Sequence, residues 1–157
     1  MGWRGSDFAV IGMLAVLAAA TALLQNAPLR DGQGAALSEQ DMRIRHVIGA
    51  QIEAFRDDAA ARAYGFAAPD LRAQFSTADA FIAMVRVHYR PVYRARNFGF
   101  TGPSRPMAAH PEMRIQRVFI TDDGGSGHVA RYIMQKQPDG SWKIAGCHLL
   151  TSSELEI

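Results

Sequence analysis

The stretch TADAFIAMVRVHYRPVYRARNFGF, residues 77–100, decides the fold, because the chain changes within it from helical to strand-like patterning. Thr77 suits a helix N-cap, since its hydroxyl can accept a hydrogen bond from an amide of the first turn. Asp79 lies in that turn, where the helix dipole favours a negative charge. One face of the helix collects Phe81, Met84, Val85 and His88. Pro91 is expected to end the helix, because it lacks an N–H and keeps Arg90 out of the α region.

Aromatic and basic side chains cluster where this helix meets the first expected strand. They are Tyr89, Arg90, Tyr93, Arg94 and Arg96. Two interpretations remain open. The side chains can bury their stems and rings while their polar tips stay in water. Alternatively, they form a rim that grips an anion or an aromatic ligand.

The composition fits one domain and excludes several classes of protein. The chain has 157 residues and a formal net charge of +2. Lys136 and Lys143 are its only lysines, and no block of basic residues indicates a nucleic-acid site. Cys147 is the only cysteine, so no intrachain disulfide can form, and we expect it to be a small buried strand residue.

The N-terminal segment is uncharged and apolar from residue 8 to residue 24. As a helix it would span about 25 Å, slightly less than the hydrocarbon core of a bilayer. Residues 1–27 are therefore either a cleaved signal peptide, with Ala20-Thr21-Ala22 as the small-residue site, or a retained membrane anchor. Both alternatives place the rest of the chain in a bacterial periplasm. Residues 28–37 read as a linker, and residues 38–157 as the globular domain.

The first part of the domain is predicted to be helical. Ser38 and Asp41 resemble a capping box, and apolar residues follow at helical spacing. These are Ile44, Val47, Ile48, Ile52 and Phe55. Asp57 or Asp58 is expected to cap a second helix through residues 59–64. Pro69 suits the first turn of a third, through Leu71 and Phe75. Three or four helices thus precede the sheet.

The second part is predicted to be an antiparallel sheet with short hairpin connections. We expect strands at residues 97–101, 113–121, 128–137 and 141–150, with an irregular loop over 102–111. Strict alternation in the last strand would place Trp142, Ile144, Gly146, His148 and Leu150 on one face and Lys143, Ala145, Cys147 and Leu149 on the other. Neither face of the sheet is cleanly polar, so we expect helices on one face and a second copy, as a homodimer, on the other.

Four segments together resemble one uncharacterised bacterial family, domain-of-unknown-function family 4864. They cover residues 48–75, 81–100, 115–121 and 137–149. The patterns F-x-x-M-V, Y-x-P-V-Y-R and P-D-G-S-W-x-I-x-G-C are specific in combination, and each is weak alone. The resemblance implies the nuclear-transport-factor-2-like (SnoaL-like) superfamily. Its fold is an α+β cone-shaped roll, with three to four helices wrapped on a curved antiparallel sheet. That superfamily includes isomerases, dehydratases, polyketide cyclases and non-catalytic domains, so the fold alone does not choose a function.

The function favoured by the residues is non-catalytic binding of a small ligand, or of a protein partner, in the cone. The candidate ligand-binding residues are Tyr64, Tyr89, Tyr93, Arg94, Arg117, Arg131 and His148. Their arginines favour an anionic ligand, and their rings an aromatic one. No catalytic residue, cofactor or metal ligand set is predicted, because the five histidines lack ligand spacing.

The alternative is an enzyme of the isomerase or lyase type. That chemistry needs a general base and a donor for the developing oxyanion. The strands contribute almost no carboxylates, which leaves His148 or Glu53 as the base, with Tyr89 or Tyr93 as the donor.

Overall fold

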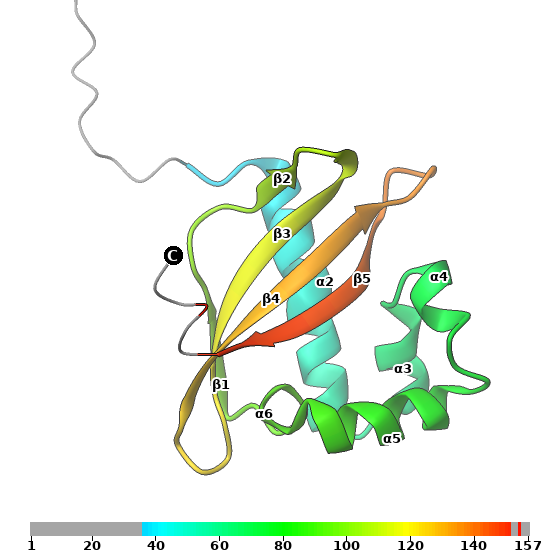
Figure 1. Ribbon diagram of the computed structural model, residues 1–157, viewed down its shortest axis with the longest axis vertical. Coiled ribbons are helices and arrows are strands. Elements are labelled where there is room, and N and C mark those ends of the chain that lie inside the picture. The colour runs from blue at the N-terminus through cyan, green and yellow to red at the C-terminus, as the bar shows by residue number, and fades with distance from the viewer. Residues whose placement is uncertain (1–35, 152–153, 155–157) are drawn as a thin grey trace, which may run out of the picture. The chain divides into compact units, whose positions relative to one another are not determined.

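The computed structural model describes residues 36–151 and residue 154, which form helices packed on one face of a curved antiparallel sheet (Figure 1). The helices are α2 (Glu39–Arg56), α3 (Ala60–Gly65), α4 (Pro69–Arg72), α5 (Ala78–His88) and α6 (Arg90–Tyr93). The strands are β1 (Asn97–Phe100), β2 (Arg105–Met107), β3 (His110–Thr121), β4 (Gly127–Lys136) and β5 (Trp142–Leu150). The α+β class predicted from the sequence is therefore confirmed.

The apolar segment at residues 8–24, with its signal-peptide and anchor alternatives, lies outside the described residues. Within the described part of the chain, no helix has both the length and the apolar character that crossing a bilayer requires.

Helix α2 forms as its sequence predicts. Ser38 and Asp41 make a full capping box, in which each side chain bonds the backbone N–H of the other. The predicted face is buried, with Ile44, Ile48 and Ile52 fully removed from solvent. This face packs against the inner side of the sheet and fixes α2 as the long helix behind it (Figure 1).

The shorter helices confirm some of the predicted signals and correct others. Thr77 caps α5 by accepting a hydrogen bond from the Ala80 N–H, at 3.1 Å. Pro69 does begin a helix, but α4 ends at Arg72 instead of continuing to residue 75. The predicted Asp57 or Asp58 cap of α3 is wrong, because Ala59 stands at the cap without a side-chain hydrogen bond.

Pro91 does not simply end the helical stretch. Helix α5 stops at His88, and a second single turn, α6, then begins at Arg90 with Pro91 in its first turn. A proline is tolerated at that position, because the first N–H groups of a helix have no intrahelical partner. The expected extended conformation at Arg90 is therefore wrong, and the turn brings Val92 and Tyr93 into the core.

The sheet has the order β1-β3-β4-β5, with β2 also paired to β3, and all of these pairings are antiparallel. Strand β3 begins at His110, three residues earlier than predicted, and the expected irregular loop contributes β2. The inner face carries buried side chains against the helices. They are Gln116, Val118, Ile120, Ala130, Tyr132 and Met134.

A β-bulge in β5 overturns the predicted faces of that strand. Met134 of β4 pairs with Ile144, whereas Ile133 pairs with Gly146, so Ala145 is an extra residue. The bulge shifts the alternation by one residue. Ile144 therefore shares the inner face with Cys147, which pairs with Tyr132. His148 instead shares the outer face with Arg131, its pairing partner.

One end of the β5 edge is covered by the segment between α3 and α4. The Ile144 N–H donates to the Phe66 carbonyl at 2.9 Å, and the Ala68 N–H donates to the Ile144 carbonyl at 2.7 Å. Ala67 forms a parallel bridge with Ile144. This pairing holds α4 beside the sheet edge and so shapes the space between β5 and the helices.

Candidate functional site

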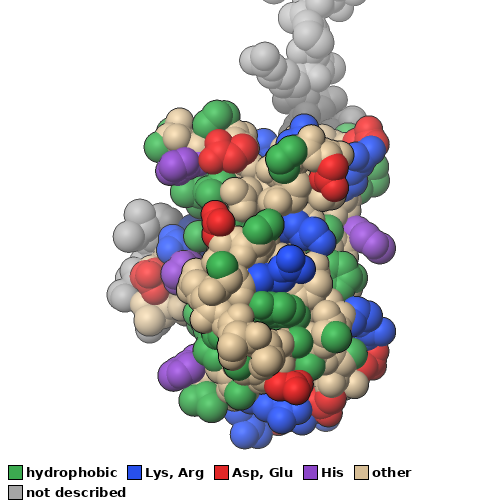
Figure 2. All heavy atoms as spheres, turned by 90° about the vertical axis from the view of Figure 1, so that its right-hand side faces the viewer, with side chains coloured by type: hydrophobic (Ala, Val, Ile, Leu, Met, Phe, Trp, Pro, Cys, Tyr) green, Lys and Arg blue, Asp and Glu red, His purple; other side chains and the backbone are tan. Residues whose placement is uncertain are grey.

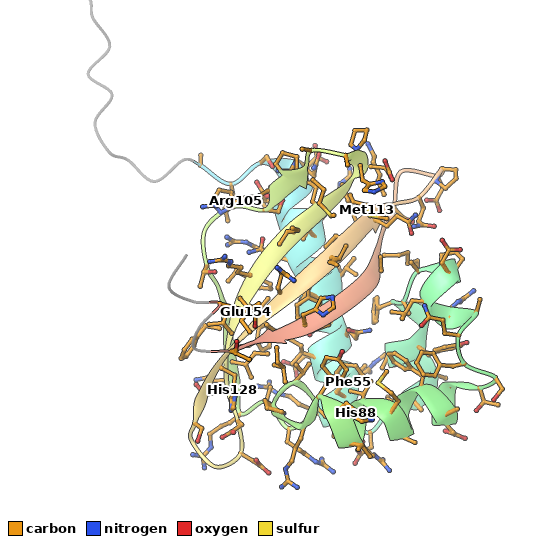
Figure 3. The ribbon with its side chains drawn as sticks, viewed as in Figure 1. Phe55, His88, Arg105, Met113, His128 and Glu154 are labelled. Atoms are coloured by element: carbon orange, nitrogen blue, oxygen red, sulfur yellow. The ribbon has the colours of Figure 1, made fainter. Side chains whose placement is uncertain are left out.

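A half-open pocket of about 440 Å³ lies between β5 and the helices. Its walls come from α2, α4, α5 and α6 and from β4 and β5, and they are mainly apolar. Phe55, Phe81, Val85 and Ile144 are among the buried residues that line it. Figure 3 labels Phe55 and His88 at the end of the molecule where α5 runs below the sheet. A pocket of this size suits a small organic ligand.

Three polar side chains face this space from neighbouring positions. They are Tyr89 after α5, Tyr132 on β4 and Cys147 on β5. Tyr132 and Cys147 are cross-strand partners, so their side chains project from the same face. Together they supply hydroxyl and thiol groups to walls that are otherwise mostly apolar.

The Tyr132 hydroxyl has no hydrogen-bond partner among the described residues, although the side chain is fully buried. The polar group beside it is the Cys147 thiol, and sulfur is only a weak hydrogen-bonding partner. Leaving a buried hydroxyl unpaired costs about 1–3 kcal/mol. The Tyr132 hydroxyl is thus a buried polar group beside the pocket whose burial cost the protein leaves without compensation.

Burial keeps these groups protonated. It raises the pKa of Cys147 to about 12 and the pKa of Tyr132 well above its ordinary value. The pKa of Tyr89 is also raised, first by burial and then by the nearby Cys147. The thiolate is the reactive form of cysteine, so the raised pKa keeps Cys147 in its less reactive thiol form at neutral pH.

His148 stands at the rim of the pocket. It borders both the main pocket and an adjoining groove, which shares Met84 and Tyr89 with the pocket and adds His88. Because His148 pairs with Arg131, its side chain belongs to the outer face of the sheet. The predicted ligand residues Tyr89 and His148 therefore meet at this mouth.

Tyr93 and Arg94 belong to a separate cluster. The Tyr93 hydroxyl donates to the Asp58 carboxylate and accepts a hydrogen bond from Arg86 Nε at 2.7 Å. Arg94 lies over the Tyr93 ring, 4.8 Å from its centroid, and pairs with Asp58 at 3.7 Å. The Tyr93 hydrogen bond, together with Arg94 and Arg86, lowers the pKa of Asp58. Asp58 itself has a positive φ of 52°.

This cluster ties the turn after α2 to α5 and α6. Figure 2 shows acidic and basic side chains close together at the lower end of the molecule, where these elements lie. Tyr93 and Arg94 contact each other and Asp58, so their polar groups are used in contacts within the protein. Neither lines the main pocket.

Tyr64 supports the fold beside the pocket. Its hydroxyl donates to the Arg72 carbonyl at 2.8 Å, and its ring packs on Phe81 with 5.6 Å between centroids. It is not among the residues that line the pocket. Tyr64 thus holds α4 onto α3 and α5.

Arg117 and Arg131 lie on the outer face of the sheet, directly opposite each other on β3 and β4. The inner face, with Val118 and Ala130, is the one that meets the helices. The two arginines are therefore separated from the pocket by the sheet itself.

The residues of the enzyme alternative are also dispersed. Glu53 is half-exposed and pairs with Arg56 at 2.7 Å on α2. Tyr93 is bound to Asp58. Only His148 and Tyr89 border the same pocket. Among the described residues, no group of three His, Cys, Asp or Glu side chains is placed to hold a metal ion.

Sequence reasoning missed Tyr132, Cys147 and Gln51 as pocket residues. Gln51 is buried on α2 and donates to the Ala63 carbonyl at 3.2 Å. The available signal was Gly146, since an isolated glycine within a strand pattern often marks a bulge. A bulge there would have moved Cys147 to the inner face opposite Tyr132.

The structure and the pocket define the chain as a small α+β domain with a mainly apolar pocket beside its sheet. Residues 37–157 match the protein family described as domain of unknown function (DUF4864), and the chain belongs to that family. Neither the curated proteins nor the solved structures gave a match to it.

Proposed function

We propose that this domain binds a small, mainly apolar and uncharged ligand in the pocket between β5 and the helices, without catalysis. The proposal includes membership of the nuclear-transport-factor-2-like superfamily and its cone-shaped roll. The order of the elements supports that membership, because helices come first and a curved antiparallel sheet follows. The apolar N-terminal segment supports export to a bacterial periplasm, with residues 8–24 as anchor or cleaved signal.

The lining of the pocket sets the class of ligand. Among the described residues that line the pocket there is no Asp, Glu, Lys or Arg, and its one histidine, His148, lies at the rim. A charged ligand would lose its hydration without gaining a partner there. The arginines that favoured an anion lie elsewhere, so the pocket itself favours a neutral molecule with an aromatic or aliphatic body.

The observation that carries the proposal is the unpaired Tyr132 hydroxyl. The hydroxyl is closed to solvent, so it would donate to an acceptor on a ligand, such as a carbonyl or ether oxygen, once the side chains around it move aside. A hydrogen bond to a bound ligand would offset part of the free-energy cost of burying this hydroxyl. Polar groups placed in this way fix the orientation of a ligand in an apolar site.

The enzyme alternative keeps one supporting observation, namely that His148 and Tyr89 border the same pocket. Under that alternative, His148 would be the base and Tyr89 the donor. An enzyme would convert the bound molecule, whereas a binding module would return it unchanged. Mass analysis of the bound molecule before and after incubation separates the two.

Native mass spectrometry tests the proposal on the full-length chain, purified from its own host in native lipid particles. We expect the wild-type chain to carry a small molecule. The variant Tyr132→Phe should retain it about tenfold less well, because one hydrogen bond is lost. Its free energy of unfolding should stay unchanged or rise by about 1 kcal/mol, since an unsatisfied group is removed.

Tyr64→Phe is the matched control, because its hydroxyl bonds the Arg72 carbonyl outside the pocket. This variant should lose a little stability and keep the bound molecule. If the purified wild-type chain is empty, or if Tyr132→Phe retains the molecule as well as the wild type does, the proposed binding mode is wrong.

A further inference from the structure

The outer face of the sheet carries a row of nitrogen-bearing side chains that the pocket does not use. Arg117 on β3 pairs with Arg131 on β4, and Arg131 pairs with His148 on β5. Neighbouring strands lie about 5 Å apart, so the row extends over about 10 Å. Arg105 on β2 shares this face, because it pairs with Ile115, two residues before Arg117.

The two central arginines lack anionic partners close by. Within the described residues, neither Arg117 nor Arg131 makes a hydrogen bond or an ion pair within 4 Å through its side chain. Like charges directly opposite each other on adjacent strands are destabilising. The sheet therefore holds a repulsive pair that an external anion would relieve.

One carboxylate of the chain already lies near this row. Glu154 follows the end of β5, and Arg131 and His148 contribute to lowering its pKa. The larger contributions come from Thr151, whose N–H and hydroxyl both donate to Glu154 at 2.8 Å. Figure 3 labels Glu154 beside the strands at this end of the sheet. Glu154 is therefore held by Thr151 within electrostatic reach of Arg131 and His148.

Apolar side chains surround the cations. Phe119 is 46% exposed on β3, two residues beyond Arg117. Ile115, Ile133, Val129 and Leu150 are partly buried on the same face. In Figure 1, α2 lies behind the sheet and α3, α4 and α5 lie beside and below it, so none of the described helices covers this face. A surface with cations among partly exposed apolar side chains suits a protein segment, which can contact both kinds of group. A small free anion would contact only one or two of the arginines.

We propose that the outer face of the sheet is a docking surface for an acidic segment of a partner protein, with carboxylates about 5 Å apart between apolar residues. Carboxylates at positions i and i+4 of a helix have this spacing. Each arginine can bind a carboxylate in bidentate geometry. A second copy of the chain is a poorer occupant, because a two-fold contact would set the row against itself.

The test uses the full-length chain in a mild non-ionic detergent and a labelled synthetic peptide. The peptide is a 14-residue helix former with Glu at i, i+4 and i+8 and Leu between them. Fluorescence anisotropy should detect binding that weakens with salt. Arg117→Glu combined with Arg131→Glu should weaken binding at least tenfold. Glu154→Gln should strengthen it by up to about fivefold, because a competing carboxylate is removed.

Arg43→Glu is the matched charge-reversal control, since Arg43 is well exposed on α2, which lies behind the sheet. It should leave peptide binding unchanged. A second peptide with Lys in place of Glu should not bind. Equal binding of both peptides, or unchanged binding by the Arg117/Arg131 variant, would overturn the proposal. So would a dimer of the wild-type chain that the same variant dissociates, because the face would then belong to a second copy.

Discussion

Asp41 connects two distant parts of the chain through one carboxylate. Its Oδ2 atom accepts hydrogen bonds from Ser38, and its Oδ1 atom accepts one from the Ser104 N–H at 2.8 Å and one from the Ser104 hydroxyl. Arg114 in turn donates to the Ser104 hydroxyl and carbonyl. The helix cap therefore also anchors the loop before β2.

These bonds predict an acid-sensitive contribution to stability. Burial alone would raise the pKa of Asp41, but the hydrogen bonds from Ser104 and Ser38 outweigh it and lower the pKa to about 2. The folded-state pKa thus lies below the ordinary value of 3.8. The stabilisation is complete above about pH 5 and is lost as the pH falls toward 2. Its size is about 2 kcal/mol.

Urea unfolding of the wild type and Asp41→Asn between pH 7 and pH 2 measures this contribution. The variant should be less stable at pH 7, and the gap should close by about 2 kcal/mol at the acid end. A gap that stays constant with pH would show that the charge of Asp41 does not contribute.

At the scale of the element, the bulge at Ala145 decides which residues of β5 face the helices. It places Ile144 and Cys147 on the same side despite their odd separation. If β5 alternated strictly from Ile144 onward with Ala145 paired regularly, Cys147 and Leu149 would turn outward and His148 would enter the core.

Deletion of Ala145 should leave these faces unchanged, because Ile144 would join Gly146 directly and regular alternation would keep Cys147 inward and His148 outward. The domain should therefore stay folded and lose about 2 kcal/mol at most. Thermal unfolding followed by circular dichroism measures the loss. The control is insertion of one glycine after Gly124 in the exposed β3–β4 loop, which changes the length without changing strand register. A melting temperature for the deletion far below that of the control would contradict this account of the bulge.

The difference between contacts that are local in the sequence and contacts between distant residues explains what the sequence could predict. Caps at Ser38 and Thr77 depend on residues three positions away, so a local pattern reveals them. The Asp41–Ser104 contact joins residues 63 positions apart, and no periodicity reports it. Strict alternation predicted that His148 shares a face with Ile144. The bulge changes the register through one extra residue, Ala145, and an alanine gives no signal of a bulge.

The candidate site was predicted only in part for a related reason. Residue type suggested that arginines and tyrosines bind a ligand, and the structure distributes them among four places. Tyr64 bonds the Arg72 carbonyl outside the pocket. Tyr89 reaches the pocket, Tyr93 and Arg94 bind Asp58, and Arg117 and Arg131 lie across the sheet. Which of these side chains share a cavity depends on packing between distant elements, which spacing along the chain does not encode.

At the scale of the whole molecule, the outer face governs self-association. The homodimer through the sheet that the sequence suggested is untested, and the Arg117–Arg131 pair opposes it, because a two-fold axis would bring the pairs of both chains together. We expect the chain to sediment as a monomer at micromolar concentration in 50 mM salt. Association should strengthen in 500 mM salt, where screening weakens the repulsion.

Sedimentation velocity at the two salt concentrations checks this expectation, and Arg117→Glu is the informative variant. It replaces repulsion by attraction across the axis and should promote association at low salt. A wild-type dimer that is tightest at low salt would show that another surface makes the contact.

The protonated state of Cys147 has one last consequence, which concerns oxidation. Peroxide and disulfide exchange act on thiolates, and a thiol with a pKa of about 12 is almost never ionised at neutral pH. A chain with a single cysteine would normally form cross-linked pairs in oxidising surroundings. Here the burial of the Cys147 sulfur slows the formation of intermolecular disulfides. We therefore expect the protein to stay free of disulfide cross-links during storage in air without a reducing agent.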